Sequence, residues 1–207
     1  MEQINQSLGL YIVPRVFLQG DRDPEGAARE AATKLGLGLK VEGWGVTLGA
    51  YGGFVKVLEE TGVSCICHET KIKGHGDVKM TKSPSIKCQE LGEAVSTMLG
   101  GGIFAKAVDE ISWAIRLGVW MGTSQAYCFF AGREGTLAHL VPVLAYNTKG
   151  WIKEGNPRKV ALVGWEVEDV AAIMRLFKLN KDTTWFAYFS LEEVDKAVAF
   201  LTSFLTS

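Results

Sequence analysis

The sequence has few of the residues that build metal and redox sites. It contains three histidines and four cysteines, and the cysteines (Cys65, Cys67, Cys88 and Cys128) form no Cys-x-x-Cys pair. Such spacing is typical of reduced thiols and differs from a disulfide framework or a common zinc motif. We therefore expect a cytoplasmic protein whose cysteines lie in the core.

Long apolar runs and charge blocks are also missing. The longest apolar stretches, such as 140–146, are far shorter than the roughly 20 residues that span a bilayer. The first residues, 1–6, include Glu2 and no basic residue, which differs from a secretory signal. The 22 basic and 23 acidic residues are interspersed, whereas nucleic-acid binders need a basic surface. We expect neither a membrane nor a nucleic-acid partner.

Familiar catalytic and nucleotide motifs are absent as well. The sequence has no Gly-Lys-Ser/Thr loop, no complete G-x-G-x-x-G and no G-x-S-x-G. Three glycine clusters, at 49–53, 100–102 and 132–135, nevertheless precede expected helices, and the amides of a helix start attract anions. Tight turns explain these glycines equally well. We expect no cofactor, and we take Gly52, Gly53, Gly101 and Gly102 as candidate ligand-binding residues.

The composition itself is that of a folded protein. Apolar residues make up 47% and charged residues 22% of the 207 residues, so the chain can bury a sizeable core. This length suits one large domain or two of about 100 residues each. We place a boundary at Gly100–Gly102, which gives units 1–100 and 101–207, with one fused domain as the alternative.

The pattern of the first 150 residues favours short β-β units between helices. We expect a strand at 8–18, a helix at 25–35 that ends at Gly36, and a second strand at 37–48. Two similar stretches then follow the order helix, strand, strand, helix. The expected elements are 53–60, 63–73, 78–82 and 85–99 in the first stretch, and 103–117, 119–121, 125–130 and 136–146 in the second. This repetition predicts an α+β fold of duplicated, ferredoxin-like or ACT-like α-β-β-α units, with a mainly antiparallel sheet covered by helices.

The carboxyl-terminal pattern is more regular. A strand at 159–165, a helix and a strand at 183–189 are expected in turn. The expected apolar face of this helix consists of Val167, Val170, Ile173, Met174 and Phe177. Ser190 and Glu193 form a capping box before a final helix with a clear apolar stripe.

The segment Cys65-Ile66-Cys67-His68 allows two interpretations. Cys and His are metal ligands, and His75 or Cys88 would be needed to complete a metal site. On a strand, however, Cys65 and Cys67 share one face and His68 points to the other. We therefore favour buried structural thiols, and Cys65, Cys67 and His75 remain secondary metal candidates.

A second candidate site lies around the hairpin expected after this segment. Two of the three histidines, in His68-Glu69 and His75-Gly76-Asp77, flank it. A carboxylate beside a histidine can orient it for acid–base chemistry, although Gly-His-Gly-Asp is also common turn chemistry. We take His68, Glu69, His75 and Asp77 as candidate ligand-binding residues, and we expect His139 to be a buried histidine with a hydrogen-bond partner.

The run from Tyr51 to Leu99 resembles two known families in its order of elements. Lys56-Val57-Leu58-Glu59-Glu60-Thr61-Gly62-Val63 is similar to the first helix of ACT-type regulatory domains, and Gly76-Asp77-Val78 is similar to a step in bacterial microcompartment shell domains. Both resemblances imply non-enzymatic oligomers.

These observations together predict a non-enzymatic homo-oligomer that binds a small molecule or regulates. An enzyme that uses His68, Glu69 and His75 on a small anionic or carbonyl substrate is one alternative. A shell-like scaffold is the other.

Overall fold

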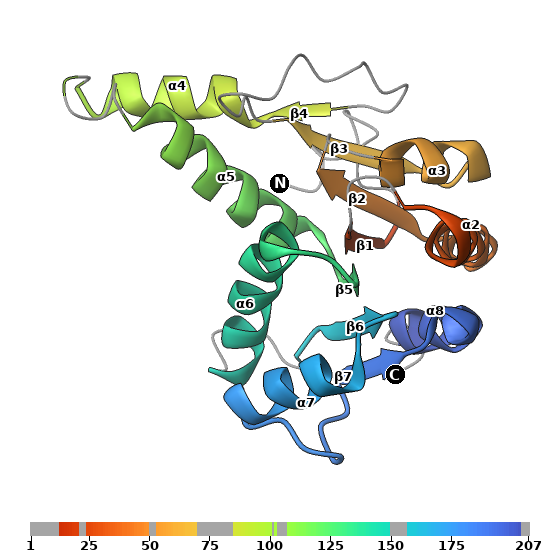
Figure 1. Cartoon of the computed structure of the whole chain (residues 1–207). Helices are drawn as coiled ribbons and strands as arrows, with labels where there is room; N and C mark the ends of the chain where they lie inside the picture. The colour runs from red at the N-terminus through yellow and green to blue at the C-terminus, as the bar shows by residue number, and fades with distance from the viewer. Residues whose placement is uncertain are drawn as a thin grey trace.

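The protein forms one parallel sheet with helices on both faces (Figure 1). The structure, a computed structural model, describes residues 13–20, 24–49, 53–69, 85–100, 102, 107–149 and 157–203. Within these ranges, strands and helices alternate along most of the chain. The strands are β1 (Arg15–Gln19), β2 (Gly45–Gly49), β3 (Cys65–Glu69), β4 (Ser85–Lys87), β5 (Ala126–Phe130), β6 (Lys159–Val163) and β7 (Phe186–Phe189). The helices are α2 (Gly26–Val41), α3 (Gly53–Thr61), α4 (Cys88–Met98), α5 (Val108–Thr123), α6 (Glu134–Thr148), α7 (Val167–Leu176) and α8 (Val194–Thr202), with a 3-10 turn, η2 (Leu191–Glu193), before α8.

The strand order is β4-β3-β2-β1-β5-β6-β7, and every neighbouring pair among the described strands is parallel. The register places Val16 opposite Val46 of β2 and opposite Ala126 of β5. The chain therefore builds one half of the sheet outward from β1 and the other half outward from β5. Strands from both sides of Gly100–Gly102 share this one sheet.

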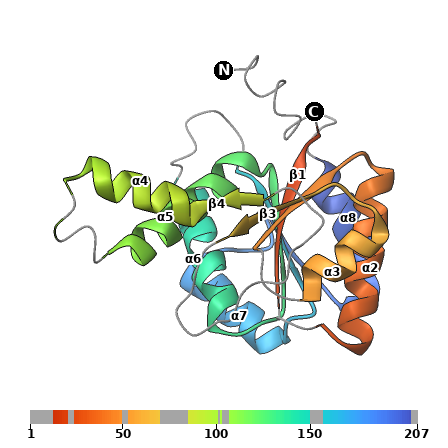
Figure 2. The same cartoon turned by 90° about the horizontal axis from the view of Figure 1, so that it is seen from above.

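Helices cover the sheet in two layers (Figures 1 and 2). On one face α2, α3 and α8 pack on a cluster that includes Leu18, Leu48 and Cys128. On the other face α5, α6 and α7 pack on a cluster that includes Phe17 and Phe129. Because side chains alternate along a strand, each strand supplies residues to both clusters. A sheet buried on both faces needs apolar residues at nearly every position, as in β5, where all five residues are buried.

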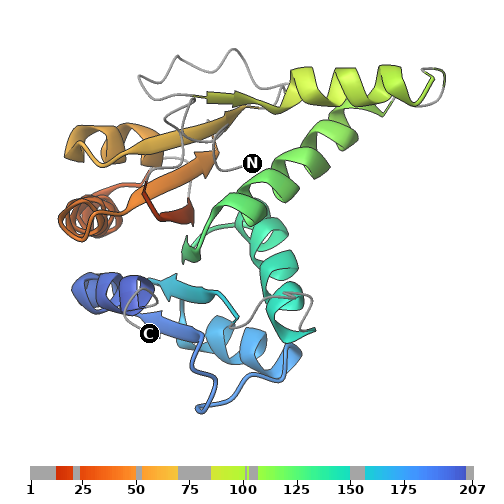
Figure 3. The same ribbon diagram turned by 180° about the vertical axis from the view of Figure 1, so that it is seen from behind.

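Helix α4 extends away from the sheet, beside α5 (Figure 3). The close approach of the two helices depends on Gly92, because a Cβ there would lie 3.0 Å from the Cα of Ser112. Cys88, the first residue of α4, is fully buried.

The predicted antiparallel α+β fold is wrong. Residues 119–121, expected to be a strand, belong to α5, which continues to Thr123. The second of the two expected β-β pairs therefore does not exist, and the predicted duplication of α-β-β-α units is not supported. The expected strand 78–82 lies outside the described residues. The observed architecture is a Rossmann-like α/β fold.

Helix α2 also differs from the prediction. We expected it to end at Gly36 and a strand to follow, but the helix continues through Gly36 and Gly38 to Val41. A Cβ at Gly36 would lie 2.8 Å from Leu58 of α3, and one at Gly38 would lie 2.9 Å from Val198 of α8. These glycines therefore permit close helix packing and do not stop the helix.

The carboxyl-terminal elements agree with the prediction. A helix, α7, follows β6 as expected, with Val170 and Ile173 buried, although Val167 is exposed. Ser190 and Glu193 form the expected capping box at η2. Across the described ranges, no helix is both long and apolar enough to cross a bilayer.

Candidate binding site at the carboxyl end of the sheet

The sheet topology marks one position as the expected ligand site. The chain leaves β1 toward β2 on one side and leaves β5 toward β6 on the other, so the loops after β1 and β5 diverge. In open α/β sheets, ligands bind outside the carboxyl ends of the strands at this switch point. The described residues nearest to it are Gly20, after β1, and Ala131 to Arg133, after β5.

Small residues hold these two loops close together. A Cβ at Gly20 would lie 2.5 Å from the Phe54 ring and 2.8 Å from the Cβ of Phe130, and one at Gly132 would lie 3.5 Å from the carbonyl carbon of Gly20. A Cβ at Gly132 would also overlap the hydroxyl of Thr136, a buried residue in the first turn of α6. Only glycine fits at these positions, and the first amides of α6 therefore lie beside the switch point.

A buried arginine lies at the end of the neighbouring strand. Arg116, in the middle of α5, has only 5% of its surface exposed. Its guanidinium lies against Gly49, the last residue of β2, where a Cβ would overlap it. Because Gly49 has no side chain, the guanidinium of Arg116 fits at the carboxyl end of β2.

His68 is the next neighbour along the sheet edge. It pairs in register with Gly49 and is 1% exposed. Neither ring nitrogen has a hydrogen-bond partner among the described residues. Burial and, to a smaller extent, the charge of Arg116 lower the pKa of His68 to about 4. The ring is therefore neutral near pH 7, with one N–H donor and one acceptor nitrogen.

The charge of Arg116 also affects the pKa of two further groups. Burial raises the pKa of the Cys88 thiol, at the start of α4, and Arg116 partly opposes this rise. Burial lowers the pKa of His139 to about 4; its hydrogen bond to the Gly135 carbonyl opposes this shift, and Arg116 adds to it. The Nδ1–H of His139 donates that bond over 2.7 Å, which agrees with the predicted satisfied histidine. Arg116 thus lies between the ends of β2 to β4 and the first turns of α6.

The paired thiols of β3 face away from this cluster. Cys65 and Cys67 belong to the core between the sheet and α2, α3 and α8. All four cysteines are buried. In the part of the chain that the structure describes, no group of three or more His, Cys, Asp or Glu side chains is placed to hold a metal ion.

The other predicted site residues are only partly visible. His75, Asp77, Gly52 and Gly101 lie outside the described residues, as does the side chain of Glu69. Gly53 begins α3 as expected. Gly102 has a positive φ of 61° and α5 begins at Val108, while residues 103–106 lie outside the described residues. Among the predicted site residues that the structure describes, His68 is the one whose side chain lies beside Arg116.

Sequence reasoning missed Arg116 and Thr136. A signal for Arg116 was present, because it is a single charge within the apolar run Ile115 to Met121. A charged residue on the buried side of a helix usually contacts a partner or a ligand. Thr136 directly follows the glycine cluster at 132–135, so its position beside this cluster was a signal for it.

The geometry suits an anion. Arg116 supplies a permanent positive charge with several N–H donors, and His68 supplies a neutral donor beside it. The first turn of α6 adds backbone amides with a partial positive charge. No described residue at this edge forms a nucleophile–base pair with His68, because its nitrogens have no partner.

Comparisons by sequence match no family model and no curated protein. Comparisons by structure do find matches. The molybdenum cofactor carrier protein of Chlamydomonas reinhardtii matches with a TM-score of 0.56 at 18% identity, covering 92% of this chain and 98% of the other. TM1055, a structural genomics target, matches with a TM-score of 0.56 at 12% identity, covering 92% and 99%. DNA processing protein A of Helicobacter pylori, which binds single-stranded DNA, matches with a TM-score of 0.51 at 9% identity, covering 92% and 80%.

These matches correct the functional predictions. The chain shares the fold of the Chlamydomonas carrier and of TM1055, so the predicted ACT-like regulatory oligomer is wrong and a homo-oligomer is not supported. The predicted exclusion of nucleic acid also loses its support, since the same fold occurs in a DNA-binding protein. At these identities the comparisons show that the chain shares the Rossmann-like fold of these proteins.

Proposed function

We propose that this protein binds and carries a small anionic cofactor at the carboxyl end of its sheet. The observation that carries the proposal is the buried guanidinium of Arg116, which lies on Gly49 beside the unpartnered imidazole of His68. The guanidinium of Arg116 supplies a fixed positive charge with N–H donors, which suits an oxyanion. A bound oxyanion would accept hydrogen bonds from Arg116, from His68 and from the amides of α6.

The similarity to the Chlamydomonas carrier suggests the molybdenum cofactor as the first cargo to test. Carriage needs only a cation and hydrogen-bond donors to hold the cargo, and Arg116, His68 and the amides of α6 supply them. The four reduced thiols further support a cytoplasmic location.

The test is isothermal titration of the purified protein with inorganic phosphate, molybdate and isolated molybdenum cofactor. Arg116→Gln should weaken binding about tenfold to a hundredfold, the equivalent of one charge-assisted hydrogen bond. Arg175→Gln, which changes an exposed arginine of α7, is the matched control and should bind like the parent.

Loss of folding must be separated from loss of binding. Circular dichroism and the melting temperature of each variant provide this control, and Arg116→Lys keeps the charge if Arg116→Gln does not fold. If none of the three anions binds the parent protein, or if Arg116→Gln and Arg175→Gln bind equally well, the proposal is wrong.

A further inference from the structure

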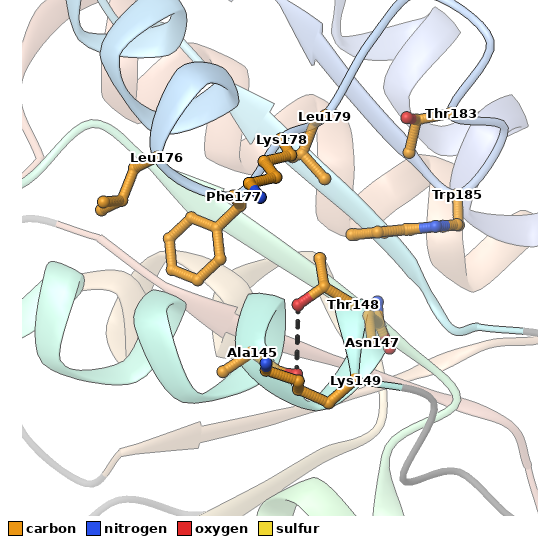
Figure 4. A pocket seen from close by; sticks show the side chains of 10 residues that line it. All are labelled: Ala145, Asn147, Thr148, Lys149, Leu176, Phe177, Lys178, Leu179, Thr183 and Trp185. Carbon is orange, nitrogen blue, oxygen red and sulfur yellow. Dashed lines mark hydrogen bonds between the residues drawn. The ribbon is translucent and has the colours of Figure 1, made fainter.

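A hollow lies at the amino ends of the strands, opposite the end that holds Arg116. It has a volume of about 700 Å³ and is lined by Ala145, Asn147, Thr148, Lys149, Leu176, Phe177, Lys178, Leu179, Thr183 and Trp185 (Figure 4). These residues come from the ends of α6 and α7 and from the segment before β7. In a parallel sheet the helices end near the amino ends of the strands, so this hollow is remote from Arg116.

The hollow has apolar walls suited to a flat ring. Figure 4 shows the ring of Phe177 and the indole of Trp185 on either side of it, with Leu179 and Thr148 between them in this view. Both aromatic side chains are partly buried against the core below. In this view the Phe177 ring is seen face-on and the Trp185 indole edge-on, and aromatic side chains in a wall suit a ligand that carries an aromatic ring.

Its polar groups have unused hydrogen-bonding capacity. The amide of Asn147 donates to the carbonyl of Arg158 over 2.8 Å, but its Oδ1 has no partner in the described chain and the residue is only 8% exposed. Lys149 and Lys178 also line the hollow, and neither forms an ion pair with a described carboxylate. The rim therefore offers two positive charges.

The backbone at Lys178 is a second, independent observation. Helix α7 ends in a Schellman motif, in which Leu179 N–H donates to Met174 over 2.8 Å and Lys178 N–H donates to Arg175 over 3.3 Å. Lys178 has a φ of 54°, a left-handed conformation that glycine adopts without strain and lysine does not. In the described chain it is the one non-glycine residue with a positive φ, and it places its side chain at the rim. Backbone strain of this kind is often found at functional sites.

We propose that this amino-edge hollow is a second binding site, for a planar aromatic anion. The ring would lie against Phe177 and Trp185, and the anionic group would meet Lys149 and Lys178. The proposal does not depend on the function of the Arg116 site.

The test uses three probes that separate the ring from the charge. These are 2-naphthoate, its neutral isostere 2-naphthamide, and inorganic phosphate. Binding is followed by the ¹H–¹⁵N signal of the Trp185 indole, assigned by its loss in Trp185→Phe. We expect 2-naphthoate to shift this signal to saturation, 2-naphthamide to bind at least several-fold more weakly, and phosphate alone to leave the signal in place.

Charge variants complete the design. Lys149→Gln combined with Lys178→Gln should raise the Kd for 2-naphthoate about tenfold, the scale of two exposed charge contacts. Lys181→Gln, in the adjacent exposed segment and outside the hollow, is the matched control. The proposal is overturned if millimolar 2-naphthoate leaves the Trp185 signal unmoved, if the amide binds equally well, or if the double variant behaves like Lys181→Gln. Each of these results is independent of phosphate, molybdate or cofactor binding at Arg116.

Discussion

At the scale of single residues, the burial of His68 and His139 makes the stability of the protein depend on pH. Both histidines have a pKa of about 4, below the ordinary value of 6.5 that they regain in the unfolded chain. Between these two values the unfolded chain binds protons that the native protein does not. The stabilising contribution of the neutral rings is therefore complete above about pH 6.5 and is lost as the pH falls toward 4.

We expect the free energy of unfolding to fall by about 1.4 kcal/mol per pH unit for each of these histidines between pH 6.5 and 4. Urea unfolding across this range measures the slope, and His68→Gln should remove about half of the contribution from the two rings. An NMR titration in which the His68 ring protonates near pH 6.5 in the folded protein would contradict this expectation.

Thiol reactivity is a further prediction at this scale. Cys65, Cys67, Cys88 and Cys128 are buried, and burial raises the pKa of the Cys88 and Cys128 thiols. Because the thiolate is the reactive form, we expect no rapid modification of these four thiols by Ellman's reagent in the native protein and four reactive thiols in denaturant. Fast modification of Cys88 in the native state would show that the start of α4 opens.

At the scale of elements, the glycines of the helices differ in what surrounds them. A Cβ at Gly36 in α2 would overlap Leu58 and Thr61 of α3, whereas one at Gly118 in α5 would meet nothing within 4 Å. Sequence alone treats both as weak points of a helix. The tertiary contact decides that only Gly36 is needed for packing.

Matched substitutions test this difference. Gly118→Ala should raise the free energy of unfolding by about 0.5–1 kcal/mol, because alanine loses less backbone entropy in a helix. Gly36→Ala should lower it by about 1–3 kcal/mol, the usual result of overpacking. Chemical denaturation of both variants gives the comparison, and an equal gain in both would show that α2 and α3 are not closely packed at Gly36.

The strained end of α7 gives a related prediction. Lys178→Gly should stabilise the protein by about 1 kcal/mol by relieving the left-handed backbone of lysine, while removing a charge from the amino-edge hollow. Thermal unfolding measures the first effect and titration with 2-naphthoate the second. A loss of stability would mean that the lysine side chain contributes more to the fold than its backbone costs.

At the scale of the whole molecule, strands from both halves of the chain form one sheet. Strand β1 pairs with both β2 and β5, which lie on either side of Gly100–Gly102. Disrupting β1 would expose both core clusters, because Phe17 belongs to one and Leu18 to the other.

We therefore expect a single cooperative thermal transition, coincident by calorimetry and by tryptophan fluorescence. Two resolved transitions would instead favour separate units at 1–100 and 101–207.

Part of this fold and site follows from local sequence. The capping box of Ser190 and Glu193 and the hydrogen bond of His139 to the Gly135 carbonyl depend on neighbours within about one turn of chain. The site at Arg116 could not be assembled from sequence in this way. It joins a residue of α5 to Gly49 and His68, which belong to β2 and β3, two strands far earlier in the chain.

The sequence by itself determined the local elements whose signals are short-range: caps, apolar stripes and the extended segment that holds Cys65 and Cys67. The parallel pairing of the strands was decided only in three dimensions, because a strand buried on both faces shows no alternation that would reveal its partner or direction. The same holds for Arg116. The sequence shows only a charged residue within an apolar helix. The tertiary structure places its guanidinium against Gly49, where the lack of a side chain leaves room for it.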